Sequence, residues 1–403
     1  MSERSALDAF DADALAADAA AALRVPSVTG GERMVLELLA DTAARLGLDP
    51  DLHEHDLAAL RAHPRYPGEE APRDELWGLA ATLPGTAPGR ICLNGHIDVV
   101  DPGSVPWRHG PWSGAVEEGV LHGRGAVDMK SAAVAMLHAA AAIRAAGGEH
   151  PEIVVQCVSS EEDGGLGTFA ELERDARFDA ALIPEPTGFD VVCAQAGALT
   201  FRLVVPGRAA HAATRLEGCS AIDRYVRIHA ALHALEAELN AGVDHPLMRE
   251  LELPYPVLVG QVHGGDWSSS VPDRVEAEGR VGVPIGADAA TIRAALEAAV
   301  VLDDGEAPVA VSWTGGAFLP GETPREDPWT ERVVAAVAAV RGATRTVGVP
   351  YGADMRLFTA RGIPCVMAGT GGLERAHAVD EWVAIDELVS LARVIVRVLS
   401  AAD

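Results

Sequence analysis

Two polar residues interrupt an otherwise apolar stretch, and their types and spacing suit metal chemistry. Residues 90–100 read RICLNGHIDVV and are predicted to form a strand that is buried on both faces. His96 and Asp98 stand two positions apart near its carboxyl end, so their side chains should point to the same side. A histidine that binds a metal through one ring nitrogen often has the other nitrogen fixed by a carboxylate. The alternative for this pair alone is a core histidine that is hydrogen-bonded to an aspartate.

Asp128 supplies a further carboxylate just before a predicted helix. This helix is rich in alanine and should end near Ala146, where two glycines follow. One interpretation of Asp128 is an N-cap that accepts backbone N–H bonds. The other is a metal ligand, and the two are compatible because a carboxylate has two oxygens and several lone pairs.

Two more predicted strands end in acidic residues. Residues 152–159 form a buried strand that is followed by Glu161 and Glu162, and residues 179–183 form one that is followed by Glu185. Acidic residues at the end of a strand ordinarily belong to a solvent-exposed turn. In open α/β sheets, however, ligand sites lie just beyond the carboxyl ends of the strands. We therefore expect these glutamates to share one edge of a sheet with the histidine and aspartates above.

The composition limits the kind of partner. A net charge of −27 on 403 residues repels phosphate backbones, so we expect no nucleic-acid binding. The five cysteines are scattered and odd in number, without a CxxC pair, which indicates buried thiols in a reducing cytosol. We see no apolar signal segment and no run long enough to span a bilayer, so a cytoplasmic protein without membrane contact is expected.

The chain is expected to hold an α/β catalytic domain with an insertion. Residues 1–196 and 315–403 should form a mostly parallel central sheet flanked by helices, the first of which are expected at residues 8–24 and 32–47. Residues 101–119 look too irregular for a regular element. Residues 197–314 are predicted to form an inserted βαββαβ unit of ferredoxin-like arrangement. Its expected strands are 199–205, 257–262, 274–283 and 309–313, and its expected helices are 220–240 and 290–301.

Several motifs together resemble one enzyme family over nearly the whole chain. They are GHIDVV at 95–100, GRGAVDMK at 123–130, the Glu161–Glu162 pair, PEPT at 184–187 and the dipeptide Ala376-His377. The chain resembles the dinuclear metallohydrolases that include acetylornithine deacetylase, succinyl-diaminopimelate desuccinylase, aminoacylase and carboxypeptidase G. Because many motifs match in register, this resemblance is more specific than any one of them.

The resemblance implies two divalent metal ions, with Zn²⁺ expected first and Co²⁺ or Mn²⁺ as alternatives. Carboxylate and imidazole ligands without thiolate suit these ions. Asp98 would orient His96, and Glu161 would be the general base that takes a proton from water and passes it to the leaving amine. The implied ligands are His96, Asp128 and Glu185 for one ion, and Asp128, Glu162 and His377 for the other.

The resemblance extends to the inserted unit. The segment around His211 resembles a lid motif whose histidine reaches into the partner subunit's site, although a surface histidine beside a turn is the alternative. Many family members carry an arginine where Gly282 stands here. Arg280, two residues earlier on the same strand face, either binds the substrate carboxylate or is an ordinary surface residue. Backbone N–H groups at Gly371 and Gly372 are further candidates for that carboxylate.

These observations predict a homodimeric, two-metal amidohydrolase that removes an acyl group from an N-acylated amino acid or a related amine. Acetylornithine deacetylase-like activity is the first expectation, with desuccinylase, dipeptidase or metallo-carboxypeptidase activity as the alternative. The alternative that is not an enzyme is a metal-binding relative without catalytic activity. Loss of the base would mark such a relative, and Glu161 is present.

Overall fold

The computed structural model describes residues 10–400, which form two compact units. The first unit contains the chain up to Cys193, Glu322–Val347 and the chain from Ala353 onward, and the second contains Ala194–Gly321 and Gly348–Gly352. Residues 8 and 9 of the first predicted helix lie outside the described part. No helix among residues 10–400 has the length and apolar character needed to cross a bilayer.

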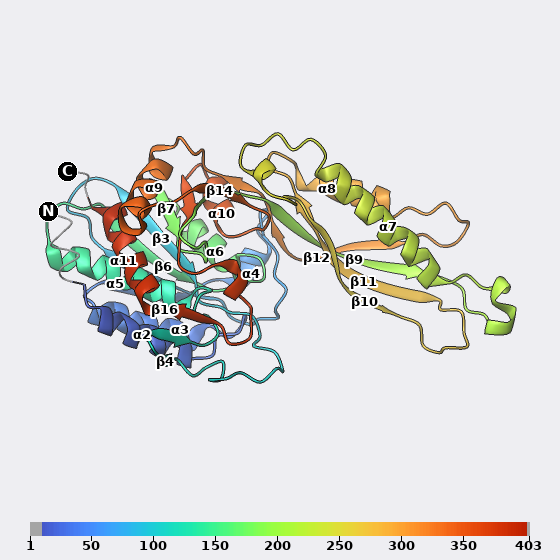
Figure 1. Ribbon diagram of the computed structural model, residues 1–403, viewed down its shortest axis with the longest axis horizontal. Helices are drawn as coiled ribbons and strands as arrows, with labels where there is room; N and C mark the ends of the chain where they lie inside the picture. Colours follow the sequence, from blue (N-terminus) through green and yellow to red (C-terminus); the bar gives the residue numbers. More distant parts are fainter. Residues whose placement is uncertain (1–9, 401–403) are drawn as a thin grey trace. The chain divides into compact units, whose positions relative to one another are not determined.

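The larger sheet is mixed, with parallel strands at its centre (Figure 1). Among the described residues it has nine strands, in the order β1-β2-β6-β3-β7-β15-β8-β13, with β14 paired to β8. The pairs β6·β3, β3·β7 and β7·β15 are parallel, whereas β1·β2, β2·β6 and β15·β8 are antiparallel. The predicted α/β class is confirmed. The strand bounds are β1 (Asp49–Glu54), β2 (Trp77–Leu83), β3 (Arg90–His96), β6 (Glu152–Val158), β7 (Ala180–Ile183), β8 (Val191–Gln195), β13 (Gly321–Glu322), β14 (Thr346–Val349) and β15 (Cys365–Met367).

The order of the central strands creates a crevice at one edge of this sheet. Helix α5 (Lys130–Ala146) connects β3 to β6, and helix α6 (Leu166–Arg174) connects β6 to β7. Because β6 and β7 lie on opposite sides of β3, the two connections run in opposite directions. Right-handed crossovers then place α5 and α6 on opposite faces of the sheet. A crevice therefore opens beyond the carboxyl ends of the adjacent strands β3 and β6.

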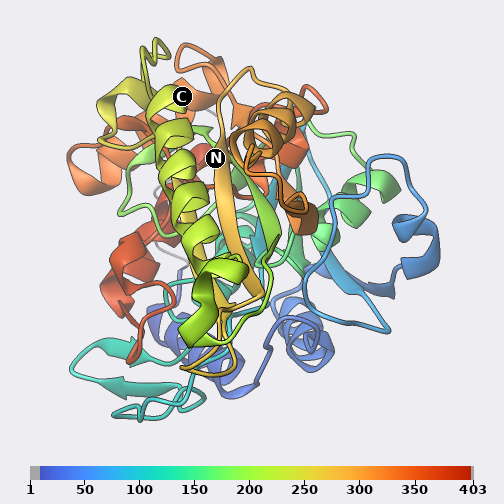
Figure 2. The same cartoon turned by 90° about the vertical axis from the view of Figure 1, so that its right-hand side faces the viewer.

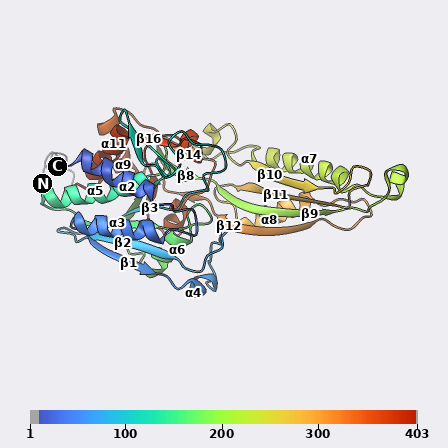
Figure 3. The same cartoon turned by 90° about the horizontal axis from the view of Figure 1, so that it is seen from below.

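Further helices pack around α5 and the sheet (Figure 3). Helices α2 (Ala12–Arg24) and α11 (Ile385–Leu399) pack on α5, and α3 (Arg33–Arg45) packs on β1 and β2. Helix α9 (Pro328–Arg341) packs on α11 and begins with a proline behind an Asp327 cap, a combination typical of helix starts. Two short helices, α4 (Leu57–Arg61) and α10 (Met355–Thr359), complete this unit.

The structure corrects two predictions about local elements. Asp128 is not the N-cap of α5, because Met129 occupies that position and no side chain caps the helix. Residues 101–119 are not wholly irregular, since β4 (Ala115–Glu117) pairs with β5 (Val120–His122) and β5 pairs with β16 (Trp382–Ala384). Strands of three residues carry too little apolar periodicity to be recognised from sequence.

The second unit has its own sheet, along which helix α7 lies (Figure 2), and its own hydrophobic core. Its sheet order is β10-β11-β9-β12, and every neighbouring pair is antiparallel. With the chain order βαββαβ, this is the ferredoxin-like arrangement. Strand β9 alternates strictly between buried and half-buried residues, and its buried side chains join the core that α7 and α8 cover. The bounds are β9 (Gly197–Pro206), α7 (Ala221–Leu239), β10 (Val257–Gly264), β11 (Arg274–Val283), α8 (Ala289–Ala299) and β12 (Ala310–Phe318).

Candidate metal centre

The crevice beyond β3 and β6 collects the acidic residues and histidines that the sequence singled out. His96 is the last residue of β3, and Glu161 and Glu162 lie in the turn that follows β6. Glu185 follows β7, the next parallel strand. His377 comes from much later in the chain and has a positive φ of 58°. Such a backbone conformation is uncommon outside glycine, and it is found where surrounding structure fixes a functional side chain.

Asp128 lies between two histidines, with one carboxylate oxygen toward each. Its Oδ1 is 3.0 Å from His96 Nε2, and its Oδ2 is 3.4 Å from His377 Nε2. Beyond this pair, His96 Nε2 lies 3.9 Å from Glu185 Oε1, and His377 Nε2 lies 3.1 Å from Glu162 Oε1. The structure thus brings all five predicted ligand side chains together, with Asp128 at the centre and a histidine and a glutamate on each side.

The chemistry of this donor set fits divalent metal ions. Two atoms bound to one Zn²⁺ at about 2.0–2.2 Å in a tetrahedral arrangement lie roughly 3.3–3.5 Å apart, which is close to the spacings above. His96, Asp128 and Glu162 offer ligand atoms that all lie within 4.8 Å of one another. Nitrogen and carboxylate oxygen donors without sulfur suit Zn²⁺, Co²⁺ or Mn²⁺. Two histidines and three carboxylates therefore could hold two such ions with one shared carboxylate.

Burial and mutual repulsion perturb the carboxylates of the crevice. Burial raises the pKa of Glu185 to about 8, and the nearby carboxylates of Asp128 and Glu162 add to this rise while His96 opposes it. Burial likewise raises the pKa of Glu161 well above its usual value, and the charge of Asp354 adds to this effect. Crowded, desolvated carboxylates are costly to keep ionised. A bound cation would relieve this cost, so the electrostatics of the crevice favour metal binding.

Asp98 contacts the turn of the glutamates as well as His96. The Nδ1–H of His96 donates to the backbone carbonyl of Asp98 at 2.9 Å, whereas the Asp98 carboxylate lies 3.5 Å from the same nitrogen. That carboxylate accepts the backbone N–H groups of Glu161 and Glu162 at 3.1 and 3.2 Å, and the Thr29 hydroxyl at 3.0 Å. Because β3 ends at His96, strict strand alternation does not extend to residue 98. The completely buried Asp98 therefore ties the end of β3 to the turn after β6.

Glu381 is a site residue that sequence reasoning missed. Its Oε1 accepts the backbone N–H groups of Val127 and Asp128 at 2.9 and 3.1 Å, and its Oε2 receives a 2.7 Å bond from Arg124. The side chains of Glu381 and Arg124 are almost fully buried. Glu381 thus fixes the backbone that aims the central carboxylate. Arg124 lies in the GRGAVDMK motif, but nothing local in the sequence pairs it with a residue 257 positions away.

Asp354 and Arg356 support the glutamate turn from a third part of the chain. Arg356 donates to the carbonyl of Gly164 at 2.7 Å and lies 3.4 Å from the Asp354 carboxylate. Both side chains are buried. Arg356 therefore holds the end of the glutamate turn from 192 positions further along the chain.

The residues predicted to bind substrate lie in both units. Gly371 has φ 57°, and a side chain there would overlap Val127, which adjoins the central aspartate. In the second unit, His211 is exposed and its Nδ1 accepts the Ala213 N–H at 3.1 Å. The Arg280 guanidinium lies 5.8 Å from the ring centre of Phe318 in the same unit. Roles for His211, Arg280, Gly371 and Gly372 in substrate binding remain predictions.

The fold and this site define a metal-dependent hydrolase, and the family follows from sequence comparison. The pattern of Peptidase family M20/M25/M40 matches residues 92–401, and the chain belongs to this family. The predicted family and hydrolase class are therefore confirmed. Succinyl-diaminopimelate desuccinylase from Methylobacterium nodulans is 31% identical over 94% of this chain and 93% of its own length. The protein of the same name from Methylorubrum extorquens is 30% identical over 95% of this chain and 97% of its own.

Solved structures support the same fold. The di-peptidase Dug1p from Saccharomyces cerevisiae has a TM-score of 0.75 at 14% identity and covers 98% of both chains. Aminopeptidase PepT from Bacillus cereus has a TM-score of 0.73 at 20% identity, with 97% of this chain and 98% of that chain covered. The Bacillus subtilis YXEP protein, described as a dinuclear metal binding peptidase of the M20 family, has a TM-score of 0.64 at 15% identity and covers 96% of this chain and 97% of its own. The family is dinuclear and metal-dependent, in agreement with the prediction of two metal ions.

The role of Glu381 can be tested by two substitutions. Glu381→Ala removes the acceptor of both backbone N–H groups and leaves Arg124 buried without its carboxylate. We expect the affinity for Zn²⁺ to fall about 10–100-fold, as is usual when a group that orients a ligand is lost. The melting temperature should fall as well, because an unpaired buried charge is strongly destabilising. Glu381→Gln keeps one oxygen for the N–H groups and should retain more of the metal affinity.

Zn²⁺ competition with a chromophoric chelator and calorimetry measure these effects. Glu374→Ala is the control, because the Glu374 side chain is 73% exposed. If Glu381→Ala binds Zn²⁺ as tightly as the control variant, Glu381 does not position the central aspartate.

Proposed function

We propose that this enzyme hydrolyses the amide bond of an N-acylated amino acid or a related amine, with N-succinyl substrates as the first class. The observation that carries the proposal is the arrangement of Asp128 between two histidine–glutamate pairs, of which only His377 is largely exposed. Relatives at about 30% identity over nearly the whole chain carry the desuccinylase name. They favour the desuccinylase alternative over the acetylornithine deacetylase-like activity that the sequence motifs alone put first.

The proposed ligands divide into two sets that share Asp128. His96 and Glu185 complete one set, and Glu162 and His377 complete the other. Zn²⁺ remains the first expectation for both ions. When bound, two such ions supply Lewis acidity that activates water and polarises the scissile carbonyl. The chain's own contribution is a mostly buried cage in which Glu381 holds the backbone of the central Asp128.

Glu161 is the proposed general base. It is 8% exposed and lies beside the crevice, within electrostatic range of His96 and Glu185. Its backbone N–H is fixed by Asp98, as is that of Glu162, so the two neighbouring side chains leave the turn in set directions. A carboxyl group in a desolvated crevice has a raised pKa, which suits the transfer of a proton from water to the leaving amine.

We also propose that the chain is a homodimer joined through residues 197–314, with His211 acting in the partner subunit's site. Besides the family resemblance, exposed apolar residues support this: Leu258 and Val262 on the edge strand β10 are 65% and 48% exposed. Unpaired edge strands with apolar side chains commonly pair with another chain. Sedimentation of the intact protein should give the mass of a dimer, and a monomer at micromolar concentration would contradict this proposal.

The adjacent glutamates should respond differently to the same substitution. Glu161→Gln keeps the shape of the side chain but cannot accept a proton, so kcat should fall by roughly 10²–10⁴-fold or more. Its metal content and KM should change little, because ground-state binding is not what is removed. Glu162→Gln should instead weaken one metal site, and excess Zn²⁺ should partly restore its activity.

Metal stoichiometry and turnover of both variants, measured under matched conditions, test this assignment. Glu149→Gln is a control substitution, because Glu149 is exposed and precedes β6, at the opposite end of that strand from the glutamate turn. Loss of metal from Glu161→Gln, with retention in Glu162→Gln, would mean that the two roles are exchanged.

The substrate class can be tested with a matched panel. The Zn²⁺-loaded enzyme should hydrolyse N-succinyl amino acids with a higher kcat/KM than N-acetyl or N-formyl amino acids and dipeptides. Chelation should abolish the activity, and Zn²⁺ or Co²⁺ should restore it. A preference for N-acetyl substrates would contradict the proposal and favour acetylornithine deacetylase-like activity. Cleavage of dipeptides alone would indicate a peptidase.

A further inference from the structure

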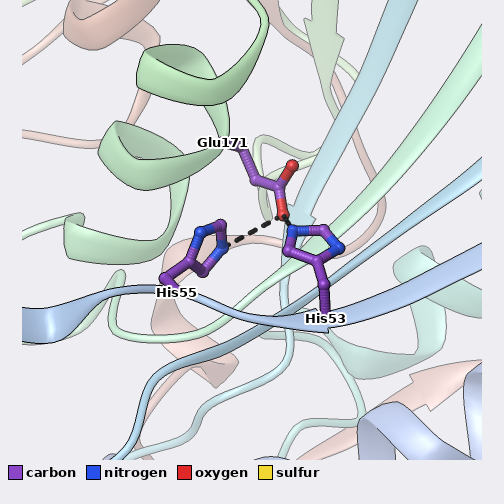
Figure 4. Close-up of side chains that lie close together, drawn as sticks. All are labelled: His53, His55 and Glu171. Atoms are coloured by element: carbon purple, nitrogen blue, oxygen red, sulfur yellow. Dashed lines mark ion pairs between the residues drawn. The ribbon is translucent and has the colours of Figure 1, made fainter.

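A second group of metal-ligating side chains lies away from the crevice described above. His53 in β1, His55 just after β1 and Glu171 in α6 point toward one another (Figure 4). One oxygen, Glu171 Oε1, lies 2.8 Å from His53 Nε2 and 3.3 Å from His55 Nε2. The Glu171 side chain is 3% exposed, and those of His55 and His53 are 7% and 14% exposed. The three residues form a nearly enclosed cluster of two imidazoles around one carboxylate oxygen.

Within the described chain, His53 Nε2, His55 Nε2 and Glu171 Oε1 are all buried, and none of them makes a hydrogen bond of good geometry. They meet one another as ion pairs, and each pair needs a positive charge on the imidazole side. Buried polar atoms that are not hydrogen-bonded are rare and costly, so this arrangement requires either protonated rings or another cation. A cation at their centre would satisfy all three at once.

The tautomer of His53 also favours a cation at the centre of the cluster. Its Nδ1 lies 3.0 Å from the backbone carbonyl of Asp51, and a carbonyl oxygen can only accept, so Nδ1 carries a proton. In the neutral ring, Nε2 then presents a lone pair to Glu171 Oε1. A backbone carbonyl that holds the far nitrogen protonated is the usual support of a metal-binding histidine. Either a metal ion or a second proton on the ring must lie between the lone pair and the carboxylate.

The distances fit a single ion. Ligand atoms of a tetrahedral Zn²⁺ site lie roughly 3.3–3.5 Å apart, given bonds of about 2.0–2.2 Å. The two nitrogen–oxygen distances of 2.8 and 3.3 Å need only a small outward movement to reach this spacing. His53 and His55 stand two positions apart, and His55 N–H still pairs with the Leu76 carbonyl at 2.8 Å, so the extended backbone puts both rings on one face.

The sheet leaves a space for the cluster at Gly78. This glycine of β2 stands directly opposite His53 in the β1·β2 register. A Cβ at position 78 would overlap Glu171 Oε1 and would lie 2.8 Å from His55 Nε2. The absence of a side chain at this one position is therefore what lets the carboxylate and the imidazoles meet.

Another His–Glu–His group is less suited to a metal ion. His109, Glu117 and His122 also lie close together. There, however, the Glu117 carboxylate is about half exposed, and its Oε2 already receives a 2.9 Å bond from Arg108. In the first cluster the neighbouring guanidinium, that of Arg174, is paired with Asp51 instead, and Glu171 is left to the two imidazoles.

We propose that His53, His55 and Glu171 bind a Zn²⁺ ion that fastens the edge strand β1 to helix α6. Solvent would complete the coordination on the side where His53 is partly exposed. This site is separate from the proposed catalytic pair of ions, although α6 directly follows the turn that carries Glu161 and Glu162. Its role is structural, because a bound ion stabilises only the folded chain, in which the three ligands meet.

The experiment counts Zn²⁺ in the intact protein. The chain is stripped with chelator, reloaded with Zn²⁺ at pH 8, desalted and analysed for zinc and for melting temperature. The variants are His53→Gln, which removes a ligand, and Gly78→Ala, which fills the space while keeping all three ligands. His63→Gln is the matched control, because His63 Nε2 lies 3.4 Å from Glu173 in a more exposed histidine–glutamate pair.

Wild type and His63→Gln should each retain one more Zn²⁺ per chain than His53→Gln and Gly78→Ala. Added Zn²⁺ should raise the melting temperature of the first two more than that of the last two, and all four should keep their turnover once loaded. Equal zinc content in wild type and His53→Gln would overturn the proposal. So would a zinc-independent difference in melting temperature that disappears as pH rises, because a proton on His53 would then be the cation.

Discussion

Several carboxylates lie close together in the crevice beyond β3, β6 and β7, where their negative charges repel one another. The rest of the catalytic unit offsets this repulsion with histidines and fixes the backbone that carries the carboxylates. Two histidines lie against the central Asp128, and they hold its pKa well below the usual range despite its burial. Glu185 lies further from its histidine, at 3.9 Å from His96 Nε2, and burial raises the pKa of both Glu161 and Glu185. Asp128 therefore stays ionised, whereas the other carboxylates have too little positive charge near them to be ionised at low cost. Bound divalent cations would supply that positive charge.

The backbone around this charge is held from several directions. Glu381 accepts hydrogen bonds from the backbone N–H groups of Val127 and Asp128, and Asp98 accepts those of Glu161 and Glu162. Arg356 holds the carbonyl of Gly164 at the far end of the same turn. Each of these supports is itself buried and ionisable. A charged group that orients a ligand in this way is as much a part of a metal site as the ligand, because it fixes the geometry in which the ion is bound.

Membership of the family determines the type of reaction but leaves the substrate open. Membership of Peptidase family M20/M25/M40 makes the chain a metal-dependent hydrolase, whereas the relatives and structural neighbours include desuccinylases, an aminopeptidase and a dipeptidase. The solved neighbours share the fold of this chain, in which the proposed metal ligands form a cage beyond the ends of the parallel strands. Their different substrates must be distinguished by groups outside that cage. In this chain the candidates for such groups, Arg280 and His211, belong to the second unit, which folds around its own core.

Buried strands that end in polar residues can be recognised over a few positions, so the sequence by itself determined the α/β class and placed His96, Glu162 and Glu185 at one edge of the sheet. The alternation of β9 and the alanine-rich helix α5 were visible for the same reason. The family, and Asp128 and His377 as further members of the site, followed from several motifs that match in register. What only the tertiary structure decided involves partners that are remote in sequence. Glu381 meets Asp128 across 253 positions, and Asp98 meets Glu162 across 64. His53, His55 and Glu171 form a cluster only because β1 pairs with β2 at a glycine and α6 packs over it. The local pattern of apolar residues carries no information about such pairs. They depend on which strands and helices become neighbours in the folded chain.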